Sequence, residues 1–295
     1  KAGEKVTYPY TESSKTNSYT LDALWEKLQG ADKVLPYDGN EHSLAEFTVK
    51  FANENLQGWT DSASSLVQAS NIQYRLKQDG KEVNEWGAMP SFKDAGVYTI
   101  EAKATVNGVE LTAEAKLTIT PKSVTVTADN KSKVFGETEP ELTAKVAGTL
   151  GNDTVEYTLS RKAGEDVGTY PITASGKAEQ GNYKVTYVAG TLTITSKVID
   201  KDGKNVEVNS PTDHEYDSKA HKWSPTVTDK KSKKKLEAGK DYEVSYDKDD
   251  FTNVGTITVT ITGKGNYSGT VTRSYKITPK SVTVTADNKS KVFGE

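Results

Sequence analysis

The side chains that most often carry enzyme or metal chemistry are scarce in this sequence. It has no cysteine and three histidines, His42, His214 and His221, among 295 residues. The lack of cysteine excludes disulfide scaffolds, zinc fingers, thiol enzymes and thiolate-bound iron clusters. Three histidines leave little material for metal-imidazole clusters or for His-based acid and base catalysis. We therefore expect a chain that is not an enzyme, with no catalytic residues, no metal and no cofactor.

Charged residues gather in three places that could bind ions or charged ligands. Calcium needs about six to eight oxygens around one point, and the acidic stretches 200–203 and 247–250 supply too few. The lysine run at 230–235 could attract sulfated or sialylated glycans by its charge. We interpret all three stretches as solvated loops, with calcium binding and glycan binding as the alternatives.

Tryptophan is the residue type that best marks a binding surface, because an exposed aromatic ring is costly unless it contacts a sugar or a protein. Among four tryptophans, Trp59 and Trp86 lie in loop-like sequence and are the candidate ligand-binding residues, although buried packing is the favoured interpretation of each. Trp25 lies in LDALWEKL, whose leucines have helical spacing, so we expect a short helix there.

The composition predicts strands with one polar face. The chain is 34% hydrophobic, with 15 Tyr and a single Met, and its threonine and valine content favours half-buried strands over helices. The formal net charge of −3 argues against a nucleic-acid-binding surface. No apolar run reaches the roughly 18 residues of a membrane-spanning helix. The expected fold class is all-β with one short N-terminal helix.

The sequence repeats itself. ITPKSVTVTADNKSKVFGE occupies 119–137 and recurs without change at 277–295, and similar strands end at Thr120, Thr195 and Thr278. Such periods are those of small tandem β modules. The predicted segments are an N-terminal segment with the helix at 1–33, a divergent β module at 34–120, a second module at 121–196, a third at 197–278, and the start of a fourth at 279–295.

A second recurring motif precedes each closing strand: KDAGVYTI at 93–100, EDVGTYPI at 165–172 and TNVGTITV at 252–259. It resembles the tyrosine corner of immunoglobulin-like sandwiches, in which a Tyr stands two residues before a Cys. Ile100, Ile172 and Val259 take the place of that Cys and should be buried. The third copy has Ile257 in place of the Tyr, so its corner hydrogen bond must be absent.

Two local patterns predict strand geometry. Alternating apolar residues from Tyr98 to Leu117, interrupted by Asn107-Gly108, predict a two-residue hairpin with one apolar and one polar face. In the second module the alternation changes phase at Ala189-Gly190, which predicts a β-bulge.

The junctions between modules are short: Pro121-Lys122, Ser196-Lys197 and Pro279-Lys280. Such short connections leave little rotational freedom, and proline stiffens two of them. The sequence therefore predicts a semi-rigid rod, roughly 100 Å long for three modules.

Residues 121–195, from SVTVTADNKSKVFGE to AGTLTIT, resemble the MBG-type repeat of bacterial surface proteins. The third module is similar to an Ig-like repeat found beside it, and the first shares the YDG start at 37–39 and the segment from Phe92. The resemblance implies adhesins or stalks on the surface or cell wall of Gram-positive bacteria, some associated with mucus or host glycoproteins, and it transfers no catalytic residues. Related mucin-binding repeats imply a β-grasp variant as an alternative to tandem Ig-like sandwiches.

The leading hypothesis is a non-catalytic, extracellular segment of a cell-surface adhesin that acts as a semi-rigid stalk, with host-ligand binding as a further role. One alternative is a specific binding module for a host glycoprotein, mucin glycan or immunoglobulin, centred on the first module and on Trp59 and Trp86. Another is a spacer in a secreted glycan-degrading enzyme. The expected partners exclude nucleic acid, we expect no membrane insertion of this segment, and the expected state is a monomer.

Overall fold

The computed structural model describes residues 25–44, 47–52, 60–61, 70–106 and 108–294, and these residues form strands, turns and loops without any helix. Within these ranges, no helix has the length and apolar character that a membrane span requires. The chain divides into two compact units. The first unit comprises Lys1–Val126, Val146–Tyr157 and Gly176–Thr186, and the second comprises Thr127–Lys145, Thr158–Ser175 and Tyr187–Glu295.

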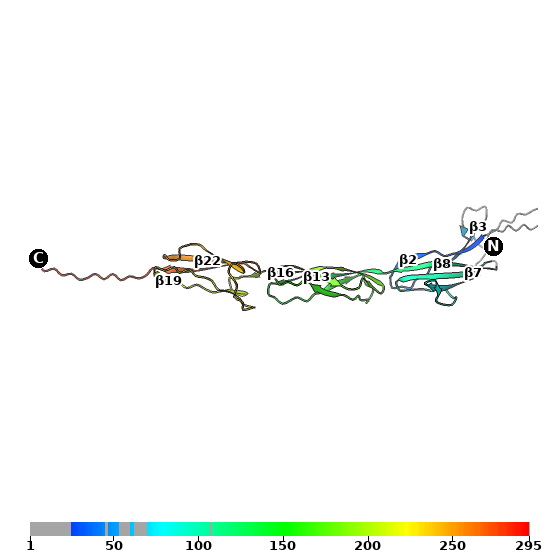
Figure 1. The fold of residues 1–295 in the computed structure, drawn as a ribbon, viewed down its shortest axis with the longest axis horizontal. Helices are drawn as coiled ribbons and strands as arrows, with labels where there is room; N and C mark the ends of the chain where they lie inside the picture. Colours follow the sequence, from blue (N-terminus) through cyan, green and yellow to red (C-terminus); the bar gives the residue numbers. More distant parts are fainter. Residues whose placement is uncertain (1–24, 45–46, 53–59, 62–69, 107, 295) are drawn as a thin grey trace, which may run out of the picture. The chain divides into compact units, whose positions relative to one another are not determined.

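The first unit is built around a five-stranded sheet (Figure 1). Its strands, in spatial order, are β2 (Lys33–Pro36), β8 (Val109–Thr120), β7 (Gly96–Val106), β5 (Ser70–Gln78) and β6 (Lys81–Glu82). A smaller sheet has the order β1 (Trp25–Gln29), β3 (Thr48–Ala52), β4 (Thr60–Asp61). A further sheet, formed mostly by residues of this unit, has the order β11 (Ala144–Ala147), β9 (Lys122–Ala128), β15 (Tyr183–Val188), β14 (Glu179–Gln180).

The predicted hairpin is confirmed as the β7–β8 pair. Val106 lies opposite Val109, and the register continues without a break to Tyr98 opposite Leu117. Most inner positions of this pair, including Ile100 and Leu117, are buried, whereas Tyr98, Leu111 and Ala113 are half-buried and Val109 beside the turn is exposed. The polar residues between them are exposed or half-buried. This alternation is what the period of two along a strand requires.

The predicted N-terminal helix is wrong wherever the structure describes it. Trp25–Gln29 is strand β1, paired antiparallel with β3 so that Leu28 lies opposite Val49. Leu28 and Val49 are both buried, and Gly30 lies so close to Phe47 and Ala115 that a Cβ would collide with both. Tertiary packing of this short segment therefore overrides its helical spacing. The part of the predicted helix before Trp25 lies outside the described residues.

The second unit contains two four-stranded sheets and two short strand pairs. The first sheet has the order β10 (Lys131–Val134), β16 (Gly190–Thr195), β13 (Gly168–Ser175), β12 (Thr158–Arg161). The second has the order β19 (His214–Glu215), β24 (Thr270–Thr278), β22 (Gly255–Gly263), β21 (Tyr242–Tyr246). The pairs are β17 (Lys197–Val198) with β23 (Tyr267–Ser268) and β18 (Val206–Val208) with β20 (Val227–Asp229).

The burial predicted for the corner segments is confirmed in all three repeats. Ile100, Ile172 and Val259 are each fully buried, so an aliphatic side chain fills the position that a disulfide would otherwise occupy. Ile257 is also buried and belongs to the apolar core of residues 199–277.

The phase change at Ala189-Gly190 is a break between two strands of different sheets, not the predicted bulge within one strand. β15 ends at Val188, and β16 begins at Gly190 in the sheet that also contains β13. A Cβ on Gly190 would lie 2.6 Å from the Ala128 carbonyl oxygen. The close backbone approach explains why glycine stands where the chain changes sheets.

Candidate functional site

The tyrosine corners hold two aspartates in place. The Tyr98 hydroxyl donates a hydrogen bond to the Asp94 carbonyl oxygen (2.9 Å), and the Tyr170 hydroxyl donates to the Asp166 carbonyl oxygen (2.8 Å). Each bond spans four residues and closes the loop that leads into β7 or β13. The corner thereby fixes the backbone of its aspartate, and the aspartate side chain is left to contact another part of the chain.

In the first unit, Asn182 binds the corner that contains Asp94. Asn182 Nδ2 donates to Asp94 Oδ1 (2.9 Å), and the Ala95 N–H donates to Asn182 Oδ1 (2.7 Å). The Asn182 carbonyl oxygen also accepts a hydrogen bond from the N–H of Lys122 (2.9 Å), the residue that begins β9. One asparagine thus connects the corner of one repeat with the start of the next.

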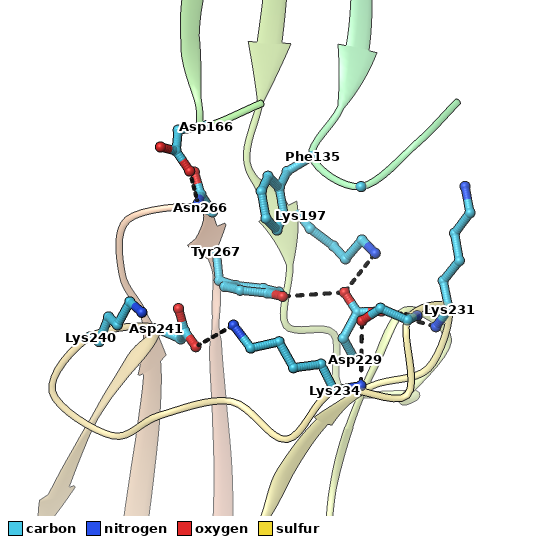
Figure 2. Close-up of a pocket in the computed structure, with 12 residues that line it drawn as sticks. Phe135, Asp166, Lys197, Asp229, Lys231, Lys234, Lys240, Asp241, Asn266 and Tyr267 are labelled. Atoms are coloured by element: carbon cyan, nitrogen blue, oxygen red, sulfur yellow. Dashed lines mark hydrogen bonds and ion pairs between the residues drawn. The ribbon is translucent and has the colours of Figure 1, made fainter. Parts of the chain in front are cut away.

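In the second unit, Asn266 makes the same three hydrogen bonds. Asn266 Nδ2 donates to Asp166 Oδ1 (2.7 Å), the Val167 N–H donates to Asn266 Oδ1 (2.7 Å), and the Lys197 N–H donates to the Asn266 carbonyl oxygen (3.0 Å). Figure 2 shows the contact between Asn266 and Asp166 beside the aromatic pair described next. We call each of these two arrangements an asparagine clamp.

An aromatic pair accompanies each clamp. The residue after Asn182 is Tyr183, whose ring meets Tyr37 edge-on at 5.7 Å between centroids. The residue after Asn266 is Tyr267, whose ring meets Phe135 edge-on at 5.5 Å. Edge-to-face pairs at these distances add stabilisation beyond the area that they bury.

Glycine is required at the tip that carries each clamp. Gly181 and Gly265 have φ angles of +58° and +64°, in the left-handed region that other residues adopt at a cost. The sequence of both tips is therefore Gly-Asn-Tyr, at 181–183 and 265–267. Each residue has a role: the glycine allows the turn, the asparagine forms the clamp and the tyrosine packs on the aromatic ring of the preceding repeat.

A buried ion pair adjoins the clamp of the second unit, because Lys197 belongs to both. Lys197 Nζ lies 2.7 Å from Asp229 Oδ2, and both side chains are almost completely buried. Asp229 Oδ1 also accepts hydrogen bonds from the N–H groups of Lys231 and Ser232. Burial alone would raise the pKa of Asp229, but the hydrogen bond from Lys197 and those backbone donors outweigh it, so the pKa is lowered.

Tyr267 extends this network. Its hydroxyl lies 3.3 Å from Asp229 Oδ2, and Figure 2 shows it directed at the same carboxylate oxygen as Lys197. Burial and the nearby negative charge of Asp229 raise the pKa of Tyr267 well above its ordinary value. The phenol therefore stays protonated and acts as a donor, which makes it a structural group and not an acid or base near neutral pH.

A hollow of about 440 Å³ adjoins this network and is lined by residues of the second unit, among them Phe135, Asp229 and Tyr267. Four lysines line it or reach its edge, which raises the question of anion binding. Each of them already has a carboxylate partner; the pairs are Lys197–Asp229, Lys231–Glu137, Lys234–Asp241 and Lys240–Glu237. The lining therefore offers no cation that is unpaired in the described part of the chain, and this argues against an anion site.

A second charged network supports the corner of the second unit. Lys133, whose side chain is buried, contacts Glu139 and Glu165, and Arg161 contacts the same two carboxylates. The hydrogen bonds from Arg161 and Lys133 lower the pKa of Glu139 to about 2. Glu165 precedes Asp166 in the chain, so this network holds the segment that receives Asn266.

The two predicted ligand-binding tryptophans are not tested equally. Trp59 lies outside the described residues. Trp86 is half-buried, with the Arg75 guanidinium 4.3 Å and the Lys103 ammonium 4.6 Å from its ring centroid. Both cations project from strands β5 and β7 of the five-stranded sheet, so Trp86 packs over this sheet and its role in binding stays a prediction.

The other candidate residues form local contacts. The carboxylate of Asp200 accepts hydrogen bonds from the backbone N–H groups of Lys204 and Asn205, and these bonds close a turn. His221 is held by Asp217 at 2.8 Å and stacks on His214 at 4.3 Å between ring centroids. The described residues contain no group of three or more histidines and carboxylates that could hold a metal ion.

Neither clamp asparagine is among the residues predicted from the sequence. The available signal was the Gly-Asn-Tyr tripeptide, which precedes two of the closing strands at similar spacing. Its meaning depends on the corners at Asp94 and Asp166, which lie 88 and 100 residues away along the chain. Nothing local to the tripeptide indicates that distant partner.

Comparison with known proteins gives one family and several structural likenesses. Residues 124–193 match the model of the MBG domain (YGX type). None of the curated protein sequences matches the chain.

Among solved structures, a three-Ig-domain segment of titin, an E-to-A mutated variant, has 13% identity and a TM-score of 0.31, with 88% of this chain and 100% of that one covered. Drosophila N-cadherin EC1-4 has 11% identity and a TM-score of 0.27, covering 92% and 82%. Extracellular domains 3-5 of Drosophila OTK have 13% identity and a TM-score of 0.24, covering 88% and 97%. These likenesses are too distant to carry a functional argument.

The family match confirms the resemblance seen in the sequence. It begins in β9 and ends in β16, so it includes the corner with Asp166, the ring of Phe135 and the tip with Asn182. The segment 124–193 of this all-β, internally repeated chain is an MBG-type repeat.

Proposed function

We propose that this chain is a non-catalytic, extracellular segment of a bacterial cell-surface protein that acts as a stalk of tandem β repeats. The observation that carries the proposal is the asparagine clamp, which recurs with the same three hydrogen bonds at Asn182 and Asn266. A clamp that connects successive repeats restricts their relative motion, which is the property that a stalk requires. A Gram-positive cell-wall adhesin is the parent protein that fits such a stalk.

The residues of the clamps support a mechanical role more than a catalytic one. Their polar groups bind one another, and the nearby Lys197–Asp229 pair is buried and fully hydrogen-bonded. A catalytic group needs access to a substrate and a proton that it can exchange near neutral pH. We therefore favour a structural role over catalysis by this segment, and a spacer in a secreted glycan-degrading enzyme stays the alternative setting for such a stalk.

A second candidate is recognition of a host glycoprotein, mucin glycan or immunoglobulin through the first repeat. It is favoured by Trp86, a half-buried ring next to Arg75 and Lys103. A hollow of about 650 Å³ lies beside it, lined by Gly87, Ala88 and Lys103 among others. Arg75 and Lys103 are paired with the carboxylates of Glu101 and Glu110, so the feature that suits a ligand is the partly exposed ring beside the hollow, which could contact a sugar ring or a protein loop.

One binding experiment separates the two candidates. The full chain is passed over immobilised mucin, a glycan array and serum glycoproteins, together with Trp86→Ala and the control Trp223→Ala, which lies in the third repeat. The stalk predicts no saturable binding by any of the three proteins. Recognition by the first repeat predicts saturable binding that Trp86→Ala weakens by more than about 1 kcal/mol and that Trp223→Ala leaves unchanged.

A further inference from the structure

The third repeat has a corner segment of the same type at the end that contains β19 and the start of β22. The corner there is Asn253-Val254-Gly255, at the position of Asp94-Ala95-Gly96 and Asp166-Val167-Gly168. Val254 is 52% exposed.

The aromatic ring has a counterpart in Tyr216. The backbone N–H of Tyr216 donates to the Thr278 carbonyl oxygen (2.9 Å), just as the N–H of Tyr37 donates to Thr120 and that of Phe135 donates to Thr195 (2.8 Å each). The three rings therefore occupy equivalent places beside the closing strand of their repeat. Tyr37 and Phe135 each meet the tyrosine of a Gly-Asn-Tyr tip, whereas Tyr216 has no aromatic partner among the residues that the structure describes.

The polar groups also have counterparts. The Val254 N–H corresponds to those of Ala95 and Val167, and the Lys280 N–H corresponds to those of Lys122 and Lys197. Asn253 is held by Asp250, to which its own N–H and Nδ2 donate, so its Oδ1 remains as an acceptor, like the Oδ1 of Asp94 and Asp166. Within the described ranges, no hydrogen bond involves the N–H of Val254, the N–H of Lys280 or Asn253 Oδ1.

The sequence indicates which partner these groups fit. Residues 277–295 repeat 119–137 without change, and 119–137 opens the repeat whose tip, Gly181-Asn182-Tyr183, fills the first clamp. We propose that Tyr216, Asn253, Val254 and Lys280 form a docking surface for the Gly-Asn-Tyr tip of a further repeat of this kind. The inference rests on the proposed stalk function and specifies how the stalk is extended.

The loss of the corner tyrosine in the third repeat fits this geometry. Ile257 has no hydroxyl to hold the carbonyl oxygen of Asn253, and two hydrogen bonds to the Asp250 carboxylate hold Asn253 instead. The receiving residue is an asparagine here and an aspartate in the other two corners. Both side chains present an Oδ1 that accepts from the incoming amide, so the polarity of the contact is preserved.

The test compares the full chain with an extended chain in which the sequence of residues 138–196 is added after Glu295. This addition completes a second copy of 119–196, including its Gly-Asn-Tyr tip. Site-resolved hydrogen–deuterium exchange is measured at the Val254 amide, with the Ala95 and Val167 amides as internal references. The matched control is the extended chain whose added tip is Gly-Ala-Tyr.

We expect exchange at Val254 to be fast in the original chain and at least about tenfold slower in the extended chain, with the slowing lost in the Gly-Ala-Tyr control. Fast exchange at Val254 in the extended chain, while the closing-strand amides of the added copy are slow, overturns the docking surface and leaves the stalk in place. Fast exchange at Ala95 and Val167 in both chains overturns the clamps themselves and the proposed function with them.

Discussion

At the scale of single residues, the Lys197–Asp229 pair is the contact whose loss should cost the most. Both charges are out of water, and removing one partner leaves the other buried without compensation, which typically costs about 3 kcal/mol or more. The substitution Lys197→Met keeps the backbone N–H that binds Asn266 and removes the ammonium alone. We expect it to lower the free energy of unfolding of the third repeat by about 3 kcal/mol at neutral pH, measured by urea denaturation.

The control for this prediction is Lys231→Met. Lys231 also contacts a carboxylate, that of Glu137, but both side chains are about half exposed, and solvent screens such pairs. We expect a much smaller change in stability for this variant. Equal losses in the two variants would contradict the importance assigned to the buried pair.

The pH dependence of the same pair follows from the lowered pKa of Asp229. A carboxyl group whose pKa is lower in the folded state stabilises the fold at pH values above its unfolded pKa, which is about 3.9 for aspartate. This stabilisation is lost as the pH falls through the lower, folded pKa. The stability difference between the wild type and Lys197→Met should therefore be largest near neutral pH, where Asp229 is charged, and should shrink as the pH falls toward and below about 4.

At the scale of the elements, the place where the chain changes sheets should tolerate substitution less well than a hairpin turn. A Cβ at Gly190 would lie 2.6 Å and 2.7 Å from the carbonyl oxygens of Ala128 and Asp129, whereas a Cβ at Gly108 would meet nothing within 4 Å. Gly108→Ala has only the strain of φ at +79°, which costs about 1 kcal/mol. Gly190→Ala must move backbone and should cost about 2 kcal/mol or more.

Chemical denaturation of the two glycine variants checks this difference. Each variant is compared with the wild type at the transition of the repeat that contains the substitution. A Gly190→Ala protein that is as stable as Gly108→Ala would show that the Ala128–Asp129 segment moves aside at little cost.

The sequence predicted those elements whose signals are local. The period of two from Tyr98 to Leu117 and the Asn-Gly turn fix the β7–β8 register without any knowledge of the rest of the fold. The buried aliphatics Ile100 and Ile172 follow from the corner motif for the same reason. At Ala189-Gly190 the sequence shows that the apolar alternation changes phase. A β-bulge and a change from one sheet to another both produce such a phase change, so the sequence does not distinguish them.

The errors and omissions concern contacts between residues that are distant in the chain. The helical spacing around Trp25 could not reveal that Leu28 pairs with Val49 in a strand. The roles of Asn182 and Asn266 could not be identified from the sequence, because their partners are the distant corners at Asp94 and Asp166. Lys197 and Asp229 likewise belong to no motif that spacing alone could identify.

At the scale of the whole molecule, the semi-rigid rod predicted from the short junctions depends on how firmly successive repeats hold one another. Each clamp supplies two hydrogen bonds from one asparagine side chain, together with an aromatic pair. Removing both asparagine side chains leaves the linkers and the two aromatic pairs in place but removes the side-chain hydrogen bonds of both clamps. The double variant Asn182→Ala, Asn266→Ala should therefore fold and yet allow its repeats to move more freely.

Small-angle X-ray scattering at several ionic strengths measures this freedom. For the wild type we expect a largest dimension of at least roughly 100 Å that does not change with salt, because hydrogen bonds and ring contacts depend weakly on screening. The double variant should give a broader distribution of interatomic distances, whereas Asn152→Ala, at an exposed asparagine outside both clamps, should match the wild type. A compact, salt-sensitive wild type would contradict the rod, and a double variant identical to the wild type would show that the linkers and the aromatic pairs supply the stiffness without the asparagine side chains.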